Sequence, residues 1–267
     1  MAQMSLQAYV DNPTITGRFV DILGKEGAEK FKAALINIYN GNKQLQQCDV
    51  RSIVGAAGLS AMLNLSITPS LGQAYIVPFR GSATFQIGTK GLIQLAHRTG
   101  KYVALHAGKI CEGELRGFNP ITGEPVTGEK ISDEVIGYVA YMRLNNGFEK
   151  TLYMTLAEIE AHAEKYSQSY SYDKKNNRQS SPWSTNFDAM ASKTVLKKLL
   201  NTWGILSTDM ASAIQADQSV VDKNTFAYVD NGGTIQRREG LYVPEEGLTV
   251  DADTGEVIEA KAEEVQS

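Results

Sequence analysis

The sequence predicts an α+β fold, in which a small antiparallel sheet of β-hairpins packs with helices and a disordered acidic C-terminal tail follows. Two tight turn signals support this fold class: Phe-Arg-Gly-Ser at 79–82 and Asn-Asn-Gly at 145–147, each between two β-rich runs. Turns this short join neighbouring antiparallel strands. Apolar residues at helical spacing before, between and after the hairpins predict the helices that cover them.

Two helices are expected before the first hairpin. Helical spacing of apolar residues predicts one over Glu26–Tyr39, ending at Gly41. Asp49 can accept a hydrogen bond from the first turn of a second helix over Val50–Leu65. Small residues in this second helix permit close packing against its neighbours.

The first hairpin is expected to join Ala74–Phe79 to Ala83–Gly88, because Gly81 in the link can adopt positive φ. A short amphipathic helix follows and stops at Gly100, and a strand over Tyr102–Ile110 comes next. The order hairpin, helix, strand predicts a sheet that meanders.

The second hairpin is expected to pair Glu134–Leu144 with Phe148–Met154. Thr155–Glu158 then has the pattern of a capping box, which predicts a helix to about Tyr166. The polar segment Ser167–Ser181 is predicted to be a long mobile loop. A further helix is predicted over Trp183–Trp203.

Charge divides the chain unequally. The formal net charge is −4, but Met210–Ser267 holds twelve acidic and four basic residues, while the other 209 residues hold 22 basic and 18 acidic. Leu71–Lys109 contains five cations and no Asp or Glu. With the loss of periodicity beyond Ala216, this predicts a folded core over 1–216 and a flexible acidic tail over 217–267, which is a candidate partner-binding segment.

Several common site types are excluded by spacing. A phosphate-binding loop needs G-x-x-x-x-G-K-[ST], whereas Gly81 and Gly88 are seven apart and Thr89 precedes Lys90. The three histidines, His97, His106 and His162, are too far apart for a local metal motif. Two cysteines, Cys48 and Cys111, are too few for a disulfide framework.

No membrane span or signal peptide is predicted, because no apolar run is long enough and the N-terminus lacks a basic start. We therefore expect a cytoplasmic protein without a membrane partner. Glu112 and Glu114 form an acidic pair beside the basic strand, and paired carboxylates can bind Mg²⁺ in a nuclease. A turn or salt-bridge role is the alternative for this pair.

The remaining chemistry is a set of cations with aromatic residues between them, which suits a sugar-phosphate backbone and stacked bases. Phe85 and Tyr102 either stack on bases or pack in the core, and strand alternation favours the core. The predicted DNA-contacting residues are Phe79, Arg80, Lys90, Arg98, Lys101, Lys109, Lys193, Lys197 and Lys198.

Four blocks extend this interpretation: Leu71–Phe79, Phe85–Gly100, Glu112–Glu114 and Trp183–Leu200. In sequence, order and spacing they closely resemble the RecT family of single-strand annealing recombinases, usually encoded by phages and prophages. The resemblance covers roughly Asn12 to Ala213 of this chain.

The resemblance implies a protein that binds single-stranded DNA and anneals complementary strands without ATP or another cofactor, through an annealed duplex intermediate. It also implies oligomeric rings or helical filaments, a 5′-to-3′ exonuclease partner and, in some cases, a host single-strand-binding protein. The predicted core would then both oligomerise and anneal DNA, with the N-terminal helices as candidate subunit interfaces.

The family pattern also assigns roles to individual residues. It places Lys90 and Arg98 at the glycine-flanked cation and the helix arginine, and Lys193 and Lys197 at its basic helix positions. The hairpin tip would reach into the DNA. Thr89 stands where the family commonly has an aromatic residue, so Phe85 or Tyr102 would have to supply that contact.

Two alternatives stay open at this point. One is a metal-dependent nuclease that uses Glu112 and Glu114. The other is a passive protector, which binds single strands but does not accelerate their pairing.

Overall fold

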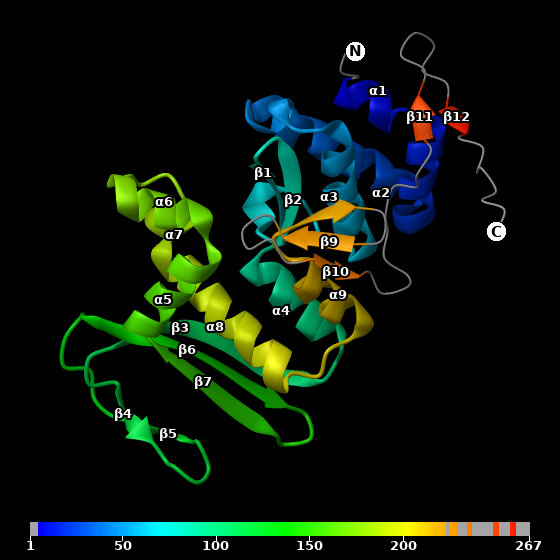
Figure 1. Cartoon of the computed structure of the whole chain (residues 1–267). Helices are drawn as coiled ribbons and strands as arrows, with labels where there is room; N and C mark the ends of the chain where they lie inside the picture. Colours follow the sequence, from blue (N-terminus) through cyan, green and yellow to red (C-terminus); the bar gives the residue numbers. More distant parts are fainter. Residues whose placement is uncertain (1–4, 223–224, 229–233, 237–247, 251–256, 260–267) are drawn as a thin grey trace, which may run out of the picture. The chain divides into compact units, whose positions relative to one another are not determined.

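The structure is a computed structural model that describes residues 5–222, 225–228, 234–236, 248–250 and 257–259. The chain forms two compact units (Figure 1). Unit 1 consists of residues 1–87 and 215–267, and unit 2 of residues 88–214. Helices and small antiparallel sheets occur in both units, which confirms the predicted α+β class.

Unit 1 contains a sheet with the strand order β1-β2-β8-β9-β10. The hairpin β1 (Ala74–Phe79) and β2 (Ser82–Ile87) is confirmed, with Phe79 paired to Ser82 across a two-residue turn. Helix α3 (Val50–Met62) packs on β1, β2 and β8 (Ser219–Asp222). Apart from the exposed Arg51, its residues from Val50 to Ala61 are buried, because its small side chains let neighbouring elements approach closely.

The first helices of unit 1 differ from the prediction. Helix α2 covers Pro13–Gly41 rather than beginning at Glu26, and its backbone leaves helical geometry at Gly24. Asn12 caps this helix through its side chain, with Pro13 in the first turn. The short helix α1 (Leu6–Val10) and α2 both pack against α3.

The first residues after Ala216 belong to the unit 1 sheet, in which β8 pairs with β2. The Asp217 carboxylate accepts a hydrogen bond from the Ile87 backbone, and the Gln218 N–H donates to the Phe85 carbonyl. Beyond β8, the structure describes the strands β9 (Thr225–Tyr228), β10 (Thr234–Gln236), β11 (Leu248–Val250) and β12 (Val257–Glu259). The other residues of the expected flexible tail, 223–224, 229–233, 237–247, 251–256 and 260–267, lie outside the described part of the chain.

Unit 2 is built on a three-stranded antiparallel sheet with β6 in the centre. The strands are β3 (Tyr102–Cys111), β6 (Val135–Leu144) and β7 (Glu149–Thr155), in the order β3-β6-β7. The predicted second hairpin is therefore confirmed. A small separate hairpin, β4 (Leu115–Phe118) with β5 (Pro125–Thr127), is inserted between β3 and β6.

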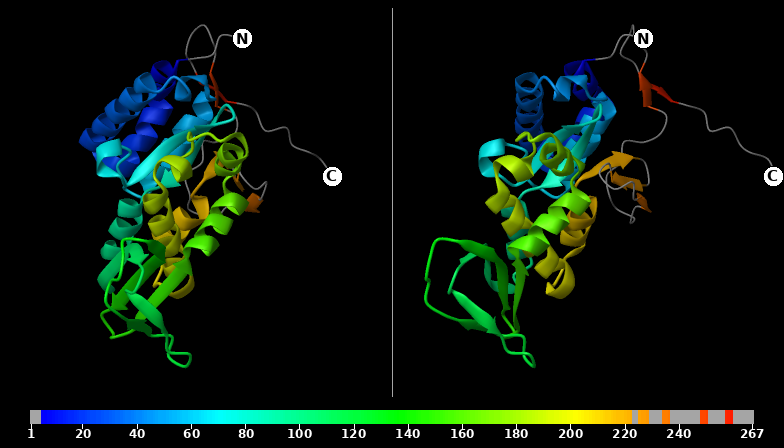
Figure 2. Two further views of the ribbon diagram at one scale, coloured as in Figure 1. Left: turned by 90° about the vertical axis from the view of Figure 1, so that its left-hand side faces the viewer. Right: turned by 60° about the vertical axis from the view of Figure 1, so that its left-hand side comes forward.

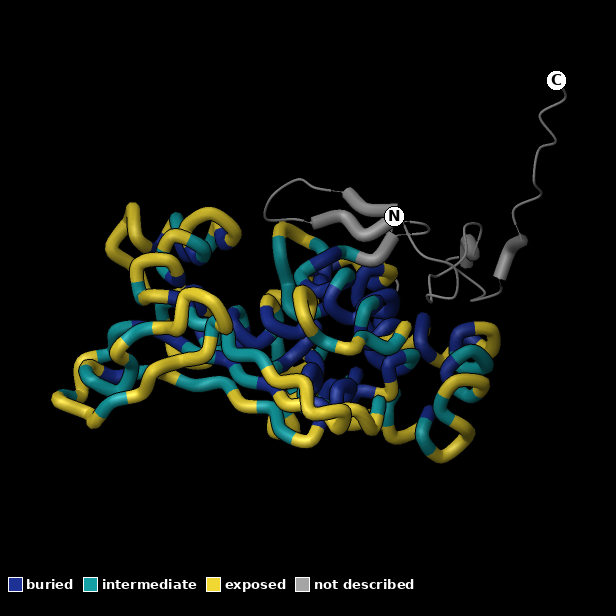
Figure 3. Tube along the Cα trace, turned by 90° about the horizontal axis from the view of Figure 1, so that it is seen from below, coloured by how far each residue is buried: buried dark blue, intermediate teal, exposed yellow. Residues whose placement is uncertain are grey.

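One face of the unit 2 sheet is covered by helices (Figures 1 and 2). Tyr138, Ala140 and Met142 point to this face and are buried, and α8 (Phe187–Trp203) crosses all three strands over them. Helix α5 (Leu156–Tyr166) begins at the predicted capping box and packs on β6 and β7. Figure 3 shows where the buried and exposed parts of the chain lie.

The prediction of a loop over Ser167–Ser181 is wrong for most of its length. It contains the helix α6 (Gln168–Asn176), and the following segment is a separate short helix, α7 (Pro182–Thr185). The buried Asp173 carboxylate organises this segment through hydrogen bonds from Ser180, Ser181 and Ser184. The predicted Trp183–Trp203 helix is consequently broken at Asn186.

Candidate nucleic-acid interface

Helix α4 (Thr89–Arg98) presents a row of cations in unit 2. Its buried side, which includes Leu92 and Leu95, faces α8 and β3. Lys90 and Arg98 lie on the exposed side, about 12 Å apart along the helix axis at 1.5 Å per residue. Lys101 follows Gly100 and is also exposed. We call Lys90, Arg98 and Lys101 the α4 cationic row.

Lys90 occupies an electrostatically unusual place on this helix. It lies in the first turn, where the partial positive charge of the helix dipole disfavours a cation. The N-cap is Gly88, which has no side chain to accept from the first-turn amides, and the first turn contains no Asp or Glu. The ammonium group and the helix dipole thus both favour an anion at this end of α4.

The lysines of α8 differ in accessibility. Lys193 is buried, with 8% of its surface exposed, whereas Lys197 is partly exposed and Lys198 is exposed. All three lysines were predicted to contact DNA. The structure places only the last two where a dissolved polyanion could reach their ammonium groups.

Lys109 is engaged with a carboxylate of α8. Its Nζ lies 3.5 Å from Oδ2 of Asp188, and the Tyr138 hydroxyl donates to the other oxygen of Asp188 at 2.5 Å. Burial and, next, this carboxylate raise the pKa of Tyr138 well above its ordinary value. Lys109 remains about half exposed, but part of its charge is already balanced within the protein.

Phe79 and Arg80 belong to unit 1, at the turn of the first hairpin. Arg80 and Gly81 both have positive φ, 48° and 80°, which is the geometry of a type I′ turn. The Arg80 guanidinium lies 5.2 Å from the centre of the Phe79 ring. The Asp49 amide donates to the Gly81 carbonyl at 2.8 Å, so the turn is attached to the start of α3.

A further group of basic and aromatic residues was missed by the sequence analysis. His162, Lys165 and Tyr166 lie one helical turn apart on α5, and the charges of Lys197 and Lys198 act on His162. Burial first, and these lysines next, lower the pKa of His162. The signal was the spacing of three and four residues within the helix that the capping box predicted.

The two aromatic residues considered for base stacking are core residues. Phe85 has no exposed surface, and Tyr102 is 8% exposed with its hydroxyl donating to the Ile205 carbonyl. The favoured core interpretation is confirmed for both. Neither ring is therefore available to supply the aromatic contact that was expected because Thr89 cannot make it.

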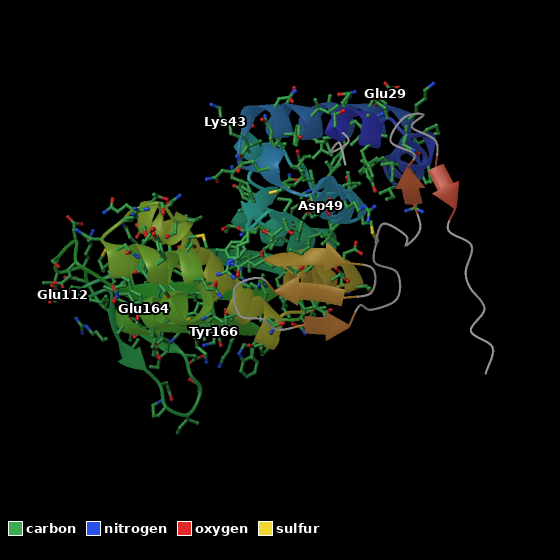
Figure 4. All side chains as sticks on the ribbon, turned by 45° about the horizontal axis from the view of Figure 1, so that its top comes forward. Glu29, Lys43, Asp49, Glu112, Glu164 and Tyr166 are labelled. Carbon is green, nitrogen blue, oxygen red and sulfur yellow. The ribbon has the colours of Figure 1, made fainter. Side chains whose placement is uncertain are left out.

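The acidic pair beside the basic strand is used within the protein. Glu114 accepts a hydrogen bond from the Cys111 amide at 2.7 Å, and Glu112, which is labelled in Figure 4, accepts one from the Ser132 hydroxyl at 2.8 Å. Among the described residues, no three His, Cys, Asp or Glu side chains are arranged to hold a metal ion. These contacts favour the turn-forming interpretation of the pair over the nuclease.

The helices give no sign of a membrane span: within the described chain, none combines the length and the apolar character that crossing a bilayer requires.

The sequence of this chain is similar to those of known proteins. The sequence profile of the RecT family matches residues 29–229. An uncharacterised protein, YqaK of Bacillus subtilis strain 168, is 43% identical over 212 residues, which are 79% of this chain and 71% of YqaK. Protein RecT of Escherichia coli K12 is 30% identical over 185 residues, 65% of each chain, so the match spans slightly less than two thirds of that relative.

Proposed function

Because this chain belongs to the RecT family, we propose that it binds single-stranded DNA and anneals complementary strands in homologous recombination. We further propose that annealing needs no ATP and that the active form is an oligomer, either a ring or a helical filament. A 5′-to-3′ exonuclease that exposes the strand and a host single-strand-binding protein are the proposed partners.

The observation that supports this function best is the α4 cationic row. It presents three exposed cations within a stretch, Leu71–Lys109, that contains no acidic residue. Cations at such spacing bind phosphates without reading sequence. An annealing protein requires this property, because base edges have to stay available for pairing.

Binding of this kind favours pairing between two like-charged strands. Cations that neutralise phosphates lower the repulsion as the strands approach. Each correct base pair then adds stacking of about 1.4 kcal/mol per step, which a mismatch loses. Specificity therefore comes from the DNA, and no covalent step by the protein is required.

We propose direct phosphate contacts for the exposed cations Lys90, Arg98, Lys101 and Lys198 and for the partly exposed Lys197. We propose an additional contact for the hairpin turn at Phe79 and Arg80. Lys109 would contribute after exchanging Asp188 for a phosphate. Lys193 is buried, so we propose that it supports the interface from within α8. Residues 217–267 are acidic overall, and the part beyond the unit 1 sheet is proposed to bind a protein partner.

An annealing assay tests the proposal. Two complementary oligonucleotides, one with a fluorophore and one with a quencher, are mixed with the protein in the absence of ATP. Faster quenching than without protein, for complementary strands only, is the expected result. Binding without acceleration would make the protein a passive strand protector, and Mg²⁺-dependent loss of full-length oligonucleotide would indicate a nuclease instead.

A further inference from the structure

Two helices that cover the same face of the unit 2 sheet carry basic and aromatic side chains, and charges from both helices act on His162. His162, Lys165 and Tyr166 come from α5, and Lys197 and Lys198 come from α8. The rings of His162 and Tyr166 have centres 4.6 Å apart, and the Lys165 ammonium lies 5.1 Å from the centre of the Tyr166 ring. We call these five residues the α5–α8 basic cluster.

The acidic groups near the cluster have partners of their own. Glu158, one turn before His162, is the acidic group on which Lys198 acts, but its carboxylate already accepts from the Thr155 amide and hydroxyl in the capping box. Glu164, which is labelled in Figure 4, pairs with Lys174 of α6, and α6 packs on α5. On β7, Tyr153 pairs with Val139 and so lies on the other face of the sheet, and its pKa is raised by burial and then by Glu158.

His162 is held in its neutral form by this environment. Burial disfavours the imidazolium, and the positive charges of Lys198, Lys197 and Lys165 disfavour it further, so the pKa of His162 is lowered. A phosphate bound among the lysines offsets the effect of their positive charges on the pKa of His162. Its negative charge favours the protonated ring, which can then donate a hydrogen bond to a phosphate oxygen.

We propose that a phosphate of single-stranded DNA binds at the α5–α8 basic cluster, and that His162 takes up a proton when it binds. Lys165, Lys197 and Lys198 supply the charge. Tyr166, 39% exposed at the end of α5, supplies a ring on which the adjacent base can stack. This site deepens the proposed DNA-binding function and rests on it.

The proposal gives binding a defined pH dependence. Protonation occurs on binding only between the lowered pKa of the free protein and the raised pKa of the complex. In that range the affinity for DNA increases as the pH falls, by at most about tenfold per pH unit for one proton per subunit. Outside it, His162 has the same charge in both states and contributes no pH dependence.

The experiment is calorimetric titration of the full-length protein with a thymidine oligonucleotide, whose bases do not titrate near neutral pH. Repeating it at one pH in buffers of different ionisation enthalpy gives the number of protons taken up on binding. His162→Gln removes the titrating group. His106→Gln is the matched control, since His106 lies exposed on the opposite face of the unit 2 sheet.

Wild-type protein and His106→Gln are expected to take up the same fraction of a proton, and His162→Gln less. Lys198→Gln, at an exposed position, keeps the test valid if His162→Gln does not fold, and is expected to lower both affinity and proton uptake. Equal uptake by wild type, His162→Gln and Lys198→Gln, with DNA bound by all three, would overturn the proton-linked site. Failure of the wild type to bind DNA would instead refute the proposed function.

Discussion

Replacing Lys90 by Gln is expected to make the protein more stable and a weaker DNA binder. Lys90 lies in the first turn of α4, where a cation opposes the helix dipole by about 0.3–1 kcal/mol. Removing its charge should raise the free energy of unfolding by that amount. The same change removes one phosphate contact, which should reduce the slope of log K against log salt by about 0.7 for single-stranded DNA.

Arg98→Gln provides the matched comparison, because Arg98 lies in the last turn of the same helix, where a cation is favourable. It should lower the free energy of unfolding by about 0.3–1 kcal/mol, while its effect on the salt slope equals that of Lys90→Gln. Urea denaturation measures the first quantity, and fluorescence anisotropy with a labelled oligonucleotide over a range of salt measures the second.

Lys130→Gln is the control for loss of a lysine elsewhere, since Lys130 pairs with Asp133 in the segment before β6. Its salt slope should stay at the wild-type value. Unchanged slopes for both Lys90→Gln and Arg98→Gln would remove the α4 cationic row from the interface. A lower free energy of unfolding for Lys90→Gln than for the wild type would refute the dipole argument, whatever the salt slopes show.

Three further predictions concern the turn, the α6 segment and the end of the chain. Arg80 has positive φ, so Arg80→Gly should raise the free energy of unfolding by about 1 kcal/mol while weakening DNA binding, and a destabilised Arg80→Gly in urea denaturation would contradict the strain. Hydrogen bonds, first of all from the Ser180 hydroxyl, lower the pKa of Asp173, so its contribution is present above about pH 4 and lost as the pH falls below it. Asp173→Asn should therefore reduce Tm by a few degrees at neutral pH and by less in acid, and an equal reduction at both pH values in calorimetry would disprove this linkage. Deletion after Gln236 should leave oligonucleotide annealing intact, whereas deletion after Ala216 removes Asp217 and β8 and should lower Tm. Equal Tm values for the two truncated proteins would show that β8 is dispensable.

The hairpins and the capped helix were predictable because local chemistry determines them. The turn at Arg80–Gly81 and the Asn-Asn-Gly turn each require positive φ, and both hairpins form where these residues occur. The capping box at Thr155 and Glu158 is likewise a local hydrogen-bonding pattern. Structure of this kind follows from neighbouring residues and needs no knowledge of the rest of the chain.

Other elements depend on contacts between distant residues. Helix α6 is polar and has little apolar periodicity, and it is fixed by serines that follow it in sequence and donate to Asp173. Strand β8 pairs with β2, more than a hundred residues away. The beginning of α2 is a different case, since Asn12–Pro13 is a local start signal that the apolar pattern alone did not reveal.

The candidate site was predictable in part. The sequence identified the cations of α4 and α8, but it could not show which α8 lysine is buried, because that depends on how the helix rotates against the sheet. The α5 residues were missed since their role becomes visible only when α5 and α8 cover the same face. Burial likewise excluded Phe85 and Tyr102 from base stacking.

The pairing of β2 with β8 also constrains the order in which the newly made chain can fold. A ribosome releases β2 long before β8, and all of unit 2 is synthesised between them. At about 5 to 20 residues per second, this interval lasts roughly 7 to 27 s. Unit 2 can complete its sheet during that time, while β2 waits with one edge exposed. The nascent protein therefore passes through a stage in which unit 2 can already fold while one edge of β2 has no partner strand, until β8 has been made.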